Sequence, residues 1–239
     1  MTVLLLTRPK DASARFWSQF TSDEQASWQS IVSPLLEIVA KEVSFDLSGY
    51  AGVVFTSTHA VEITSQKTMQ RGLAFCVGRH TTDRAVALGW DAYCFGANVD
   101  GFVRALDPVQ GPLLHLRGQH TRGDLCNRLQ NQGQLSEETI VYDQRYCSFS
   151  TAAQRALEAE VPVIAPIFSP RTAEQFVKLC SAAQNLYLVA MSEAVAEPLS
   201  ALDAKDLIVA QDPTAAAMAE GVRLVAMRLA RVEGNKTAQ

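Results

Sequence analysis

A strand-then-helix step recurs three times in the first half of the sequence and three times, in the same order, in the second half. In the first step of each half, an apolar run ends in a phenylalanine and a hydroxyl residue, Phe55-Thr56 and Phe168-Ser169, and a helix follows. The paired segments are 54–61 with 167–174, 75–82 with 189–196, and 90–106 with 206–231. Three matches in one order indicate that the chain contains two copies of one structural unit.

The strands of both copies are predicted from short apolar runs without in-out alternation, such as Val3–Leu6 and Gly52–Thr56. Strands of this kind are buried on both faces, and helices between them place successive strands in parallel. We expect strands at 3–6, 35–43, 52–56, 74–77, 90–95, 112–118, 139–142 and 206–210, and helices at 11–20, 57–71, 98–106, 124–132 and 213–231. The sequence therefore predicts an α/β protein with two parallel-sheet, Rossmann-like domains.

The order of the copies indicates that one domain is inserted in the other. A chain of 239 residues is long enough for two domains of ordinary size. Segments 36–43 and 139–146 flank the first copy and its extra strand, so they are the natural places for the chain to cross between domains. We expect a discontinuous first domain, residues 1–38 and 145–239, and an inserted second domain, residues 39–144.

Charge, hydropathy and cysteine usage restrict the partners and the location. The net charge is −4, and the sequence has no cluster of lysine and arginine, so a nucleic-acid partner is not expected. No apolar run reaches the roughly 20 residues of a membrane helix, and the apolar start of the chain is too short for a signal peptide. The five cysteines include no close-spaced pair. A cytoplasmic location follows as an expectation.

No pattern in the sequence calls for a metal or a cofactor. The four histidines, His59, His80, His115 and His120, form no HExxH motif and no cluster with cysteine at ligand spacing. His115 lies in a predicted strand and is interpreted as a core residue. Neither a GxGxxG nor a GxxxxGK[ST] motif occurs, so a nucleotide site is not expected either.

The candidate binding residues lie in loops at the carboxyl ends of the predicted strands, where parallel sheets bind ligands and helix amides point outward. Hydroxyl side chains and backbone amides in such loops suit a ligand with several carboxylates, held in the cleft between the two domains. Serine or threonine after a strand is also the usual helix N-cap, and this alternative remains open for each residue. The candidates are Arg8, Thr56, Ser57, Gly78, Thr81, Arg117, Gly118, Ser169, Arg171 and Ser192.

Tyr142 ends an apolar run beside the predicted crossover. Its ring could anchor the crossover while its hydroxyl faces the cleft, where a phenol can donate a proton to a leaving hydroxyl. A purely structural tyrosine is the alternative.

Short motifs, in order along nearly the whole chain, resemble uroporphyrinogen-III synthases of the haem pathway. Each motif is short, but the order and spacing of the set are specific. The motifs are Leu-Leu-Thr-Arg-Pro at 5–9, Val-Val-Phe-Thr-Ser-x-x-Ala-Val at 53–61, Val-Gly-x-x-Thr at 77–81, Leu-x-Leu-Arg-Gly at 114–118, Val-Tyr at 141–142 and Phe-Ser-Pro at 168–170.

This resemblance implies two flavodoxin-like domains joined by a two-stranded linker. It implies cyclisation of the linear tetrapyrrole hydroxymethylbilane with loss of water and inversion of ring D, without a cofactor. Tyr142 then matches the tyrosine that assists departure of the hydroxyl. The family also implies a monomer, and we expect transient contact with hydroxymethylbilane synthase. One loop departs from the family: Ser192-Glu193-Ala194-Val195 replaces Gly-x-x-Thr, so Val195 offers no hydroxyl.

Two other classes fit the residues less well. A two-lobed binding or regulatory protein for small anions would share the architecture but not turn its ligand over. A methyltransferase or dehydrogenase would need a nucleotide motif.

Overall fold

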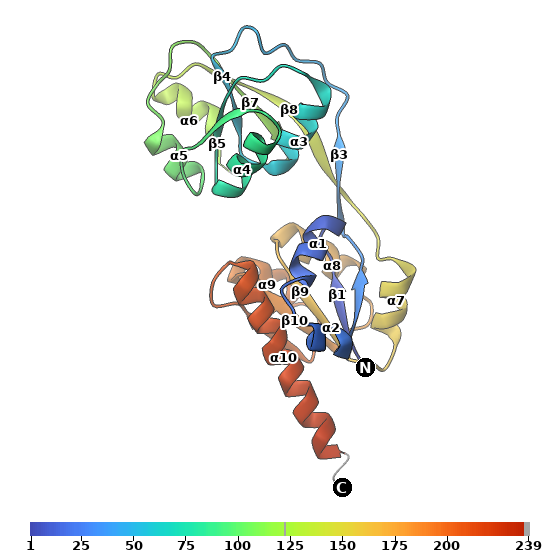
Figure 1. The fold of residues 1–239 in the computed structure, drawn as a ribbon. Helices are drawn as coiled ribbons and strands as arrows, with labels where there is room; N and C mark the ends of the chain where they lie inside the picture. The colour runs from blue at the N-terminus through green and yellow to red at the C-terminus, as the bar shows by residue number, and fades with distance from the viewer. Residues whose placement is uncertain (122, 237–239) are drawn as a thin grey trace. The chain divides into compact units, whose positions relative to one another are not determined.

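The computed structural model describes residues 1–121 and 123–236 of the chain (Figure 1). The chain divides into two compact units. Unit 1 consists of Met1–Glu37 and Tyr146–Gln239, and unit 2 consists of Ile38–Arg145.

Unit 1 is built on a five-stranded parallel sheet with the order β2-β1-β9-β10-β11. Numbered along the chain within this unit, the order is 2-1-3-4-5, which is the flavodoxin-like arrangement. Its strands are β1 (Thr2–Leu6), β2 (Trp28–Val32), β9 (Val163–Ile167), β10 (Leu186–Ala190) and β11 (Asp206–Val209). Its helices are α1 (Lys10–Trp17), α2 (Ser22–Ser27), α7 (Thr151–Glu158), α8 (Pro170–Leu179), α9 (Glu193–Leu199) and α10 (Ala215–Lys236).

Helices cover both faces of this sheet. Alternate residues of β1 enter different cores: Val3 and Leu5 pack in the cluster that contains α7, α8 and α9, whereas Leu4 and Leu6 pack with α1 and α10. A strand buried on both faces cannot alternate apolar and polar residues, which explains the continuous apolar run that predicted it.

Unit 2 contains a six-stranded sheet with the order β3-β8-β7-β4-β5-β6. β8 to β6 in this order are parallel. Backbone bonds from Lys41 to Val141 and from Cys147 to Leu35 show that β3 runs antiparallel to β8, and both strands cross the boundary between the units. The strands are β3 (Leu36–Ala40), β4 (Gly52–Phe55), β5 (Leu73–Cys76), β6 (Asp91–Cys94), β7 (Leu113–Gly118) and β8 (Ser136–Tyr146). The helices are α3 (Thr58–Lys67), α4 (Arg79–Ala87), α5 (Val99–Ala105) and α6 (Leu125–Asn131).

The two sheets share one order of parallel strands, but the chain enters that order at a different strand in each unit. If β7 and β8 stand for β1 and β2, the parallel part of unit 2 also reads 2-1-3-4-5, so unit 2 is a circular permutation of unit 1. The predicted α/β class with two parallel sheets and the predicted repeat are both confirmed. In unit 2, α3 and α4 pack on one face of the sheet and α5 and α6 on the other.

The structure corrects the alignment of the repeat by one residue. The amide of Val77 donates to the carbonyl of Phe55, and the amide of Met191 donates to that of Ile167. Phe55 therefore corresponds to Ile167, and the sequence alignment of Phe55 with Phe168 was wrong. The true match is between the helix N-caps, Ser57 and Ser169.

The second correction concerns the second strand. The sequence predicted one strand at 35–43, but the strand that pairs with β1 is β2, and the short helix α2 before it was missed. β2 has the sequence Trp-Gln-Ser-Ile-Val and lies at the edge of the sheet, and Ile31 is its one buried residue. An edge strand of this kind gives little hydrophobic signal.

Candidate active site

A cavity of about 310 Å³ lies at the carboxyl ends of β4 and β7 in unit 2. Here the strand order of the flavodoxin-like plan reverses direction, and open α/β sheets bind ligands at this point. The lining combines hydroxyl groups, two imidazoles and apolar side chains. It consists of Thr56, Ser57, Val77, Asn98, Val99, His115, His120, Thr121, Gly123, Leu125 and Tyr142. Three of the predicted site residues, Thr56, Ser57 and Tyr142, therefore meet in one cavity.

Tyr142 is held rigidly on the cavity wall. Its side chain is 5% exposed, and its hydroxyl donates to Ser57 Oγ at 3.1 Å. Its ring meets the imidazole of His59 edge to face, with the centroids 5.9 Å apart. Burial raises the pKa of the phenol above its usual value, an effect that the hydrogen bond to Ser57 partly offsets. At neutral pH Tyr142 is therefore an un-ionised O–H donor.

Gly118 makes room for this ring. A Cβ atom at Gly118 would lie 2.5 Å from Tyr142 Cζ, closer than carbon atoms approach in folded proteins. The amide of Gln119 also donates to the Tyr142 carbonyl at 2.8 Å. The absence of a side chain at Gly118 thus positions Tyr142.

Ser57 is the N-cap of α3, as the alternative reading of the sequence proposed, but it does more than cap. Its Oγ accepts from the amide of His59 at 3.2 Å and from the Tyr142 hydroxyl. Because both bonds use the lone pairs of Oγ, the Ser57 proton can be donated to a ligand in the cavity.

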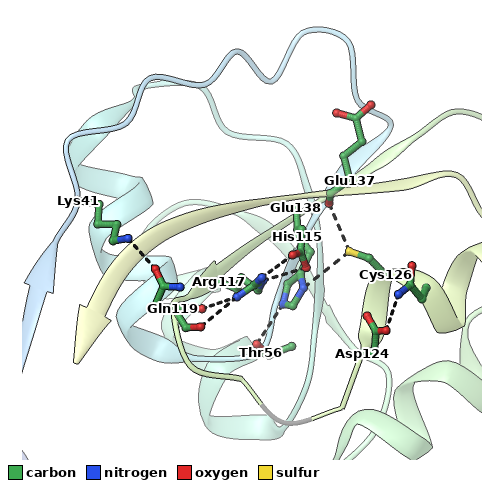
Figure 2. Close-up of polar contacts among 11 residues, drawn as sticks. Lys41, Thr56, His115, Arg117, Gln119, Asp124, Cys126, Glu137 and Glu138 are labelled. Atoms are coloured by element: carbon green, nitrogen blue, oxygen red, sulfur yellow. Dashed lines mark hydrogen bonds and ion pairs between the residues drawn. The ribbon is translucent and has the colours of Figure 1, made fainter. Parts of the chain in front are cut away.

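The hydroxyl of Thr56 contacts the buried imidazole of His115 (Figure 2). His115 Nε2 lies 3.2 Å from Thr56 Oγ1, on the neighbouring strand. The imidazole is 3% exposed, and burial lowers its pKa from 6.5 to about 4. His115 is therefore neutral at pH 7 and either donates to the threonine hydroxyl or accepts from it. The prediction that His115 is a satisfied core residue is confirmed, but it also contacts the site.

Arg117 is engaged within the protein. Its guanidinium forms a two-point ion pair with Glu138, with one bond of 2.9 Å from Nε, and its Nη1 donates to the Gly118 carbonyl at 2.9 Å. The hydrogen bond to Glu138 raises the pKa of Arg117, and the same bond lowers the pKa of Glu138. Both groups are charged at neutral pH.

Gly78 and Thr81 lie at the next strand-to-helix turn. Gly78 adopts φ 80°, a conformation that favours glycine, and its amide donates to the Gly96 carbonyl at 2.7 Å. Thr81 is buried within α4, with 7% of its surface exposed. Gly78 therefore serves the turn itself, and its neighbour Val77 is the residue of this turn that reaches the cavity.

The remaining predicted residues lie in unit 1. Arg8 follows β1, and its guanidinium lies 4.4 Å from the centre of the Phe168 ring, which follows β9. Ser169 caps α8 by accepting from the amide of Thr172 at 3.2 Å, and its hydroxyl bonds to that of Thr172 at 2.8 Å. Arg171 stacks on Tyr146 at 5.0 Å. These residues lie at the carboxyl ends of β1 and β9, the place in unit 1 that corresponds to the cavity in unit 2.

Ser192 is the N-cap of α9, the helix that follows β10, and β10 is the neighbour of β9 in the sheet. Its side chain makes no capping bond to this helix. The backbone amides of Val195 and Ala196 donate to the Ser192 carbonyl, at 2.9 and 3.0 Å.

Sequence reasoning missed one cluster of chemically active side chains. A ring nitrogen of His115, Cys126 Sγ and a carboxylate oxygen of Glu138 lie within 4.8 Å of one another. They come from β7, α6 and β8, so no local spacing links them. The signal that could have found them is the pairing of β7 with β8, which sets His115 opposite Glu138.

Fold and site together define a class: a two-unit flavodoxin-like protein with a hydroxyl-lined cavity at a strand switch point. A family model described as uroporphyrinogen-III synthase HemD matches residues 18–220. The chain belongs to the uroporphyrinogen-III synthase family. Its function is that of this family, the cyclising hydro-lyase of haem biosynthesis.

Solved structures agree with this fold. The chain is similar to the uroporphyrinogen-III synthetase of Helicobacter pylori, with 15% identity and a TM-score of 0.66 over 94% of this chain and 100% of that one. It is also similar to a mutant uroporphyrinogen III synthase of Thermus thermophilus, with 11% identity and a TM-score of 0.54 over 95% and 100% of the two chains. A search of curated proteins found no match. Among the described residues, no helix is both long and apolar enough to cross a membrane.

Proposed function

We propose that the cavity of unit 2 holds the reacting part of hydroxymethylbilane and that Tyr142 is the catalytic residue that assists departure of its hydroxyl. The observation that supports this most directly is the buried phenol on the cavity wall, held at 3.1 Å from Ser57 Oγ. Hydroxymethylbilane carries its leaving hydroxyl on a methylene beside a pyrrole, whose nitrogen supplies the electrons that expel it. The enzyme needs only to stabilise the departing oxygen.

The chemistry of Tyr142 suits a hydrogen-bond donor better than a strong acid. Because burial raises the pKa of the phenol, full ionisation in the cavity is costly, while its O–H remains available through neutral pH. As the C–O bond breaks, negative charge grows on the leaving oxygen and strengthens this hydrogen bond. Tyr142 would exchange its bond to Ser57 for one to the substrate, and Ser57 would remain beside it as a second hydroxyl.

Thr56 and His115 also line the cavity. Because burial keeps the imidazole neutral at pH 7, His115 acts at the cavity wall as a hydrogen-bond partner. The Thr56 hydroxyl, oriented by His115, can bond to a pyrrole substituent. Catalysis then consists mainly of holding a flexible tetrapyrrole so that the ring D carbon that bears the chain meets the activated methylene of ring A.

The other predicted residues are proposed to bind the acetates and propionates at the rim of the substrate. Arg8 and Arg171 in unit 1 offer guanidinium groups, and each is already oriented by an aromatic ring. The hydroxyls of Ser169 and Ser192 lie at helix starts, where carboxylates are favoured. In unit 2 we propose the same role for Gly78, Thr81, Arg117 and Gly118 at the strand ends. Arg117 would then have to leave Glu138 in part.

The test is Tyr142→Phe, which removes only the hydroxyl. Freshly generated hydroxymethylbilane is supplied to the enzyme, and the type I and type III isomers of the product are separated. We expect type III formation to slow about tenfold, since one hydrogen bond to a charged group contributes on the order of 1.5 kcal/mol. Tyr93→Phe is the matched control, because Tyr93 is also in unit 2 but 52% exposed. An unchanged rate in Tyr142→Phe would remove Tyr142 from the mechanism.

We further propose a cytoplasmic monomer that receives hydroxymethylbilane by transient contact with hydroxymethylbilane synthase. Among the described residues no cysteine forms a disulfide bond, which is typical of a reducing compartment. Hydroxymethylbilane closes spontaneously without rearrangement, so a short transfer favours the type III product. Sedimentation of the protein, alone and with the synthase, tests the monomer and the contact.

A further inference from the structure

We propose that His115, Cys126 and Glu138 form a binding site for a zinc-class divalent cation beneath the cavity of unit 2. Figure 2 shows the three side chains converging from β7, α6 and β8. Their ligand atoms lie within 4.8 Å of one another, and His115 and Cys126 are buried. An imidazole nitrogen, a thiolate and a carboxylate form the mixed ligand set that Zn²⁺ accepts, with the fourth position left to water.

The spacing of the two buried donors is close to that of a zinc site. Cys126 Sγ lies 4.0 Å from His115 Nδ1. In a tetrahedral site with ordinary Zn–S and Zn–N lengths the two atoms are about 3.6 Å apart. The donors therefore need to approach each other by only a few tenths of an ångström. The other nitrogen of the ring faces Thr56, so it is Nδ1 that remains for the metal.

An outer contact holds the imidazole in place, since His115 Nε2 lies 3.2 Å from Thr56 Oγ1. Partners of this kind orient metal ligands and fix the tautomer of histidine. The Cys126 thiol donates to the carbonyl of Glu137 at 3.5 Å and gives up this bond when it loses its proton to bind the metal. With a cation on Nδ1, the proton of His115 must lie on Nε2, which makes the imidazole a donor to Thr56. The site would thus set the direction of a hydrogen bond at the cavity wall.

Glu138 is the exposed ligand of the site, and its ion-pair partner Arg117 competes with the cation for it. Its carboxylate is exposed at the surface and charged, and it is paired with the guanidinium of Arg117. A divalent cation replaces that monovalent partner, while Arg117 keeps the carbonyl of Gly118 as an acceptor. The thiol of Cys126 loses its proton to solvent as the metal–sulfur bond forms, so one proton is released for each cation bound.

The experiment titrates the full chain with Zn²⁺ against a competing chelator and, separately, with Co²⁺, whose thiolate complexes absorb in the near ultraviolet. We expect one tight site per chain and a sulfur-to-cobalt charge-transfer band. Cys126→Ser should abolish the band and lower Zn²⁺ affinity at least tenfold. Cys94→Ser is the matched control, because Cys94 is an exposed thiol of the same unit and should leave both readouts unchanged.

Glu138→Gln covers the case in which a change at the buried Cys126 prevents folding. Glu138 is exposed at the surface, so this variant should fold, keep the charge-transfer band and bind Zn²⁺ at least tenfold more weakly. Wild-type affinity in Cys126→Ser or in Glu138→Gln would overturn the proposal, as would a band lost in Cys94→Ser. No substrate is present in these titrations, so their failure leaves the proposed role of Tyr142 untouched.

Discussion

Gly118→Ala is the sharpest test of how the site is built. The added Cβ would lie 2.5 Å from Tyr142 Cζ, 2.6 Å from Cε2 and 2.8 Å from the hydroxyl oxygen. Ordinary contacts between carbon atoms are about 3.5–4.0 Å. The Tyr142 ring must therefore move by about 1 Å, because the methyl group is attached to the backbone of β7 and cannot turn away.

Two costs and one gain set the magnitude of the stability change. Overpacking of a buried ring costs about 1–3 kcal/mol, and the 3.1 Å bond from Tyr142 to Ser57 would lengthen beyond hydrogen-bonding distance, at a further cost of about 1 kcal/mol. Replacing glycine by alanine in a strand recovers about 0.5–1 kcal/mol of chain entropy. Gly118 does not adopt a positive φ, so the backbone itself tolerates alanine. The clash prevails, and we expect a loss of about 1–3 kcal/mol.

Urea unfolding and the isomer assay measure the two consequences together. Gly118→Ala should lower stability by the amount above and slow type III formation as much as Tyr142→Phe does. The control is Gly72→Ala, since a Cβ at Gly72 meets no atom within 4 Å. In a Tyr142→Ala background the cost of Gly118→Ala should vanish. A cost that persists undiminished in that background would refute the packing argument.

Two further predictions follow from the contacts of the site. Ser57→Ala and Ser150→Ala each remove an N-cap, of α3 and of α7, and should each destabilise the protein by about 1 kcal/mol in urea unfolding. Only Ser57→Ala should also slow turnover, because it removes the hydroxyl beside Tyr142 in the cavity; equal effects of both variants on turnover would contradict this. Because the pKa of His115 is about 4 in the folded protein and 6.5 ordinarily, the unfolded chain binds the proton first, and stability falls as the pH is lowered from 7 towards 4. Between pH 7 and pH 4, with a chelator present, the free energy of unfolding of the wild type should fall by about 3 kcal/mol more than that of His115→Gln. Equal decreases in the two proteins would show that His115 is not buried as a neutral group.

Local signals sufficed for much of the fold. β1, β4 and β9 are buried on both faces, so their apolar runs alone identify them. The N-caps Ser57 and Ser169 lie two residues beyond the ends of β4 and β9 and mark the helix starts. The circular permutation could be inferred only in part, because the repeat shows which steps correspond but not which strands pair.

The contacts that make the site were beyond local signals. Tyr142 meets Ser57 across 85 positions of the chain, and this contact depends on the pairing of β8 with β7 and of β7 with β4. The grouping of His115 with Glu138 depends on the same pairing. Hydrophobic periodicity predicts that a strand exists, but not its neighbours or its register.

The two switch points of the repeated plan have diverged in chemistry. In unit 2 the position after β4 carries Thr56, backed by a neutral imidazole, whereas the corresponding position after β9 in unit 1 carries Phe168, beneath the guanidinium of Arg8. Burial lowers the pKa of Arg8, but its guanidinium remains charged at neutral pH. A guanidinium in the position of Thr56 would oppose the positive charge that develops on the pyrrole as the hydroxyl leaves, whereas in unit 1 it can bind a carboxylate. The physical chemistry of the two positions therefore favours bond breaking in unit 2 and anion binding in unit 1.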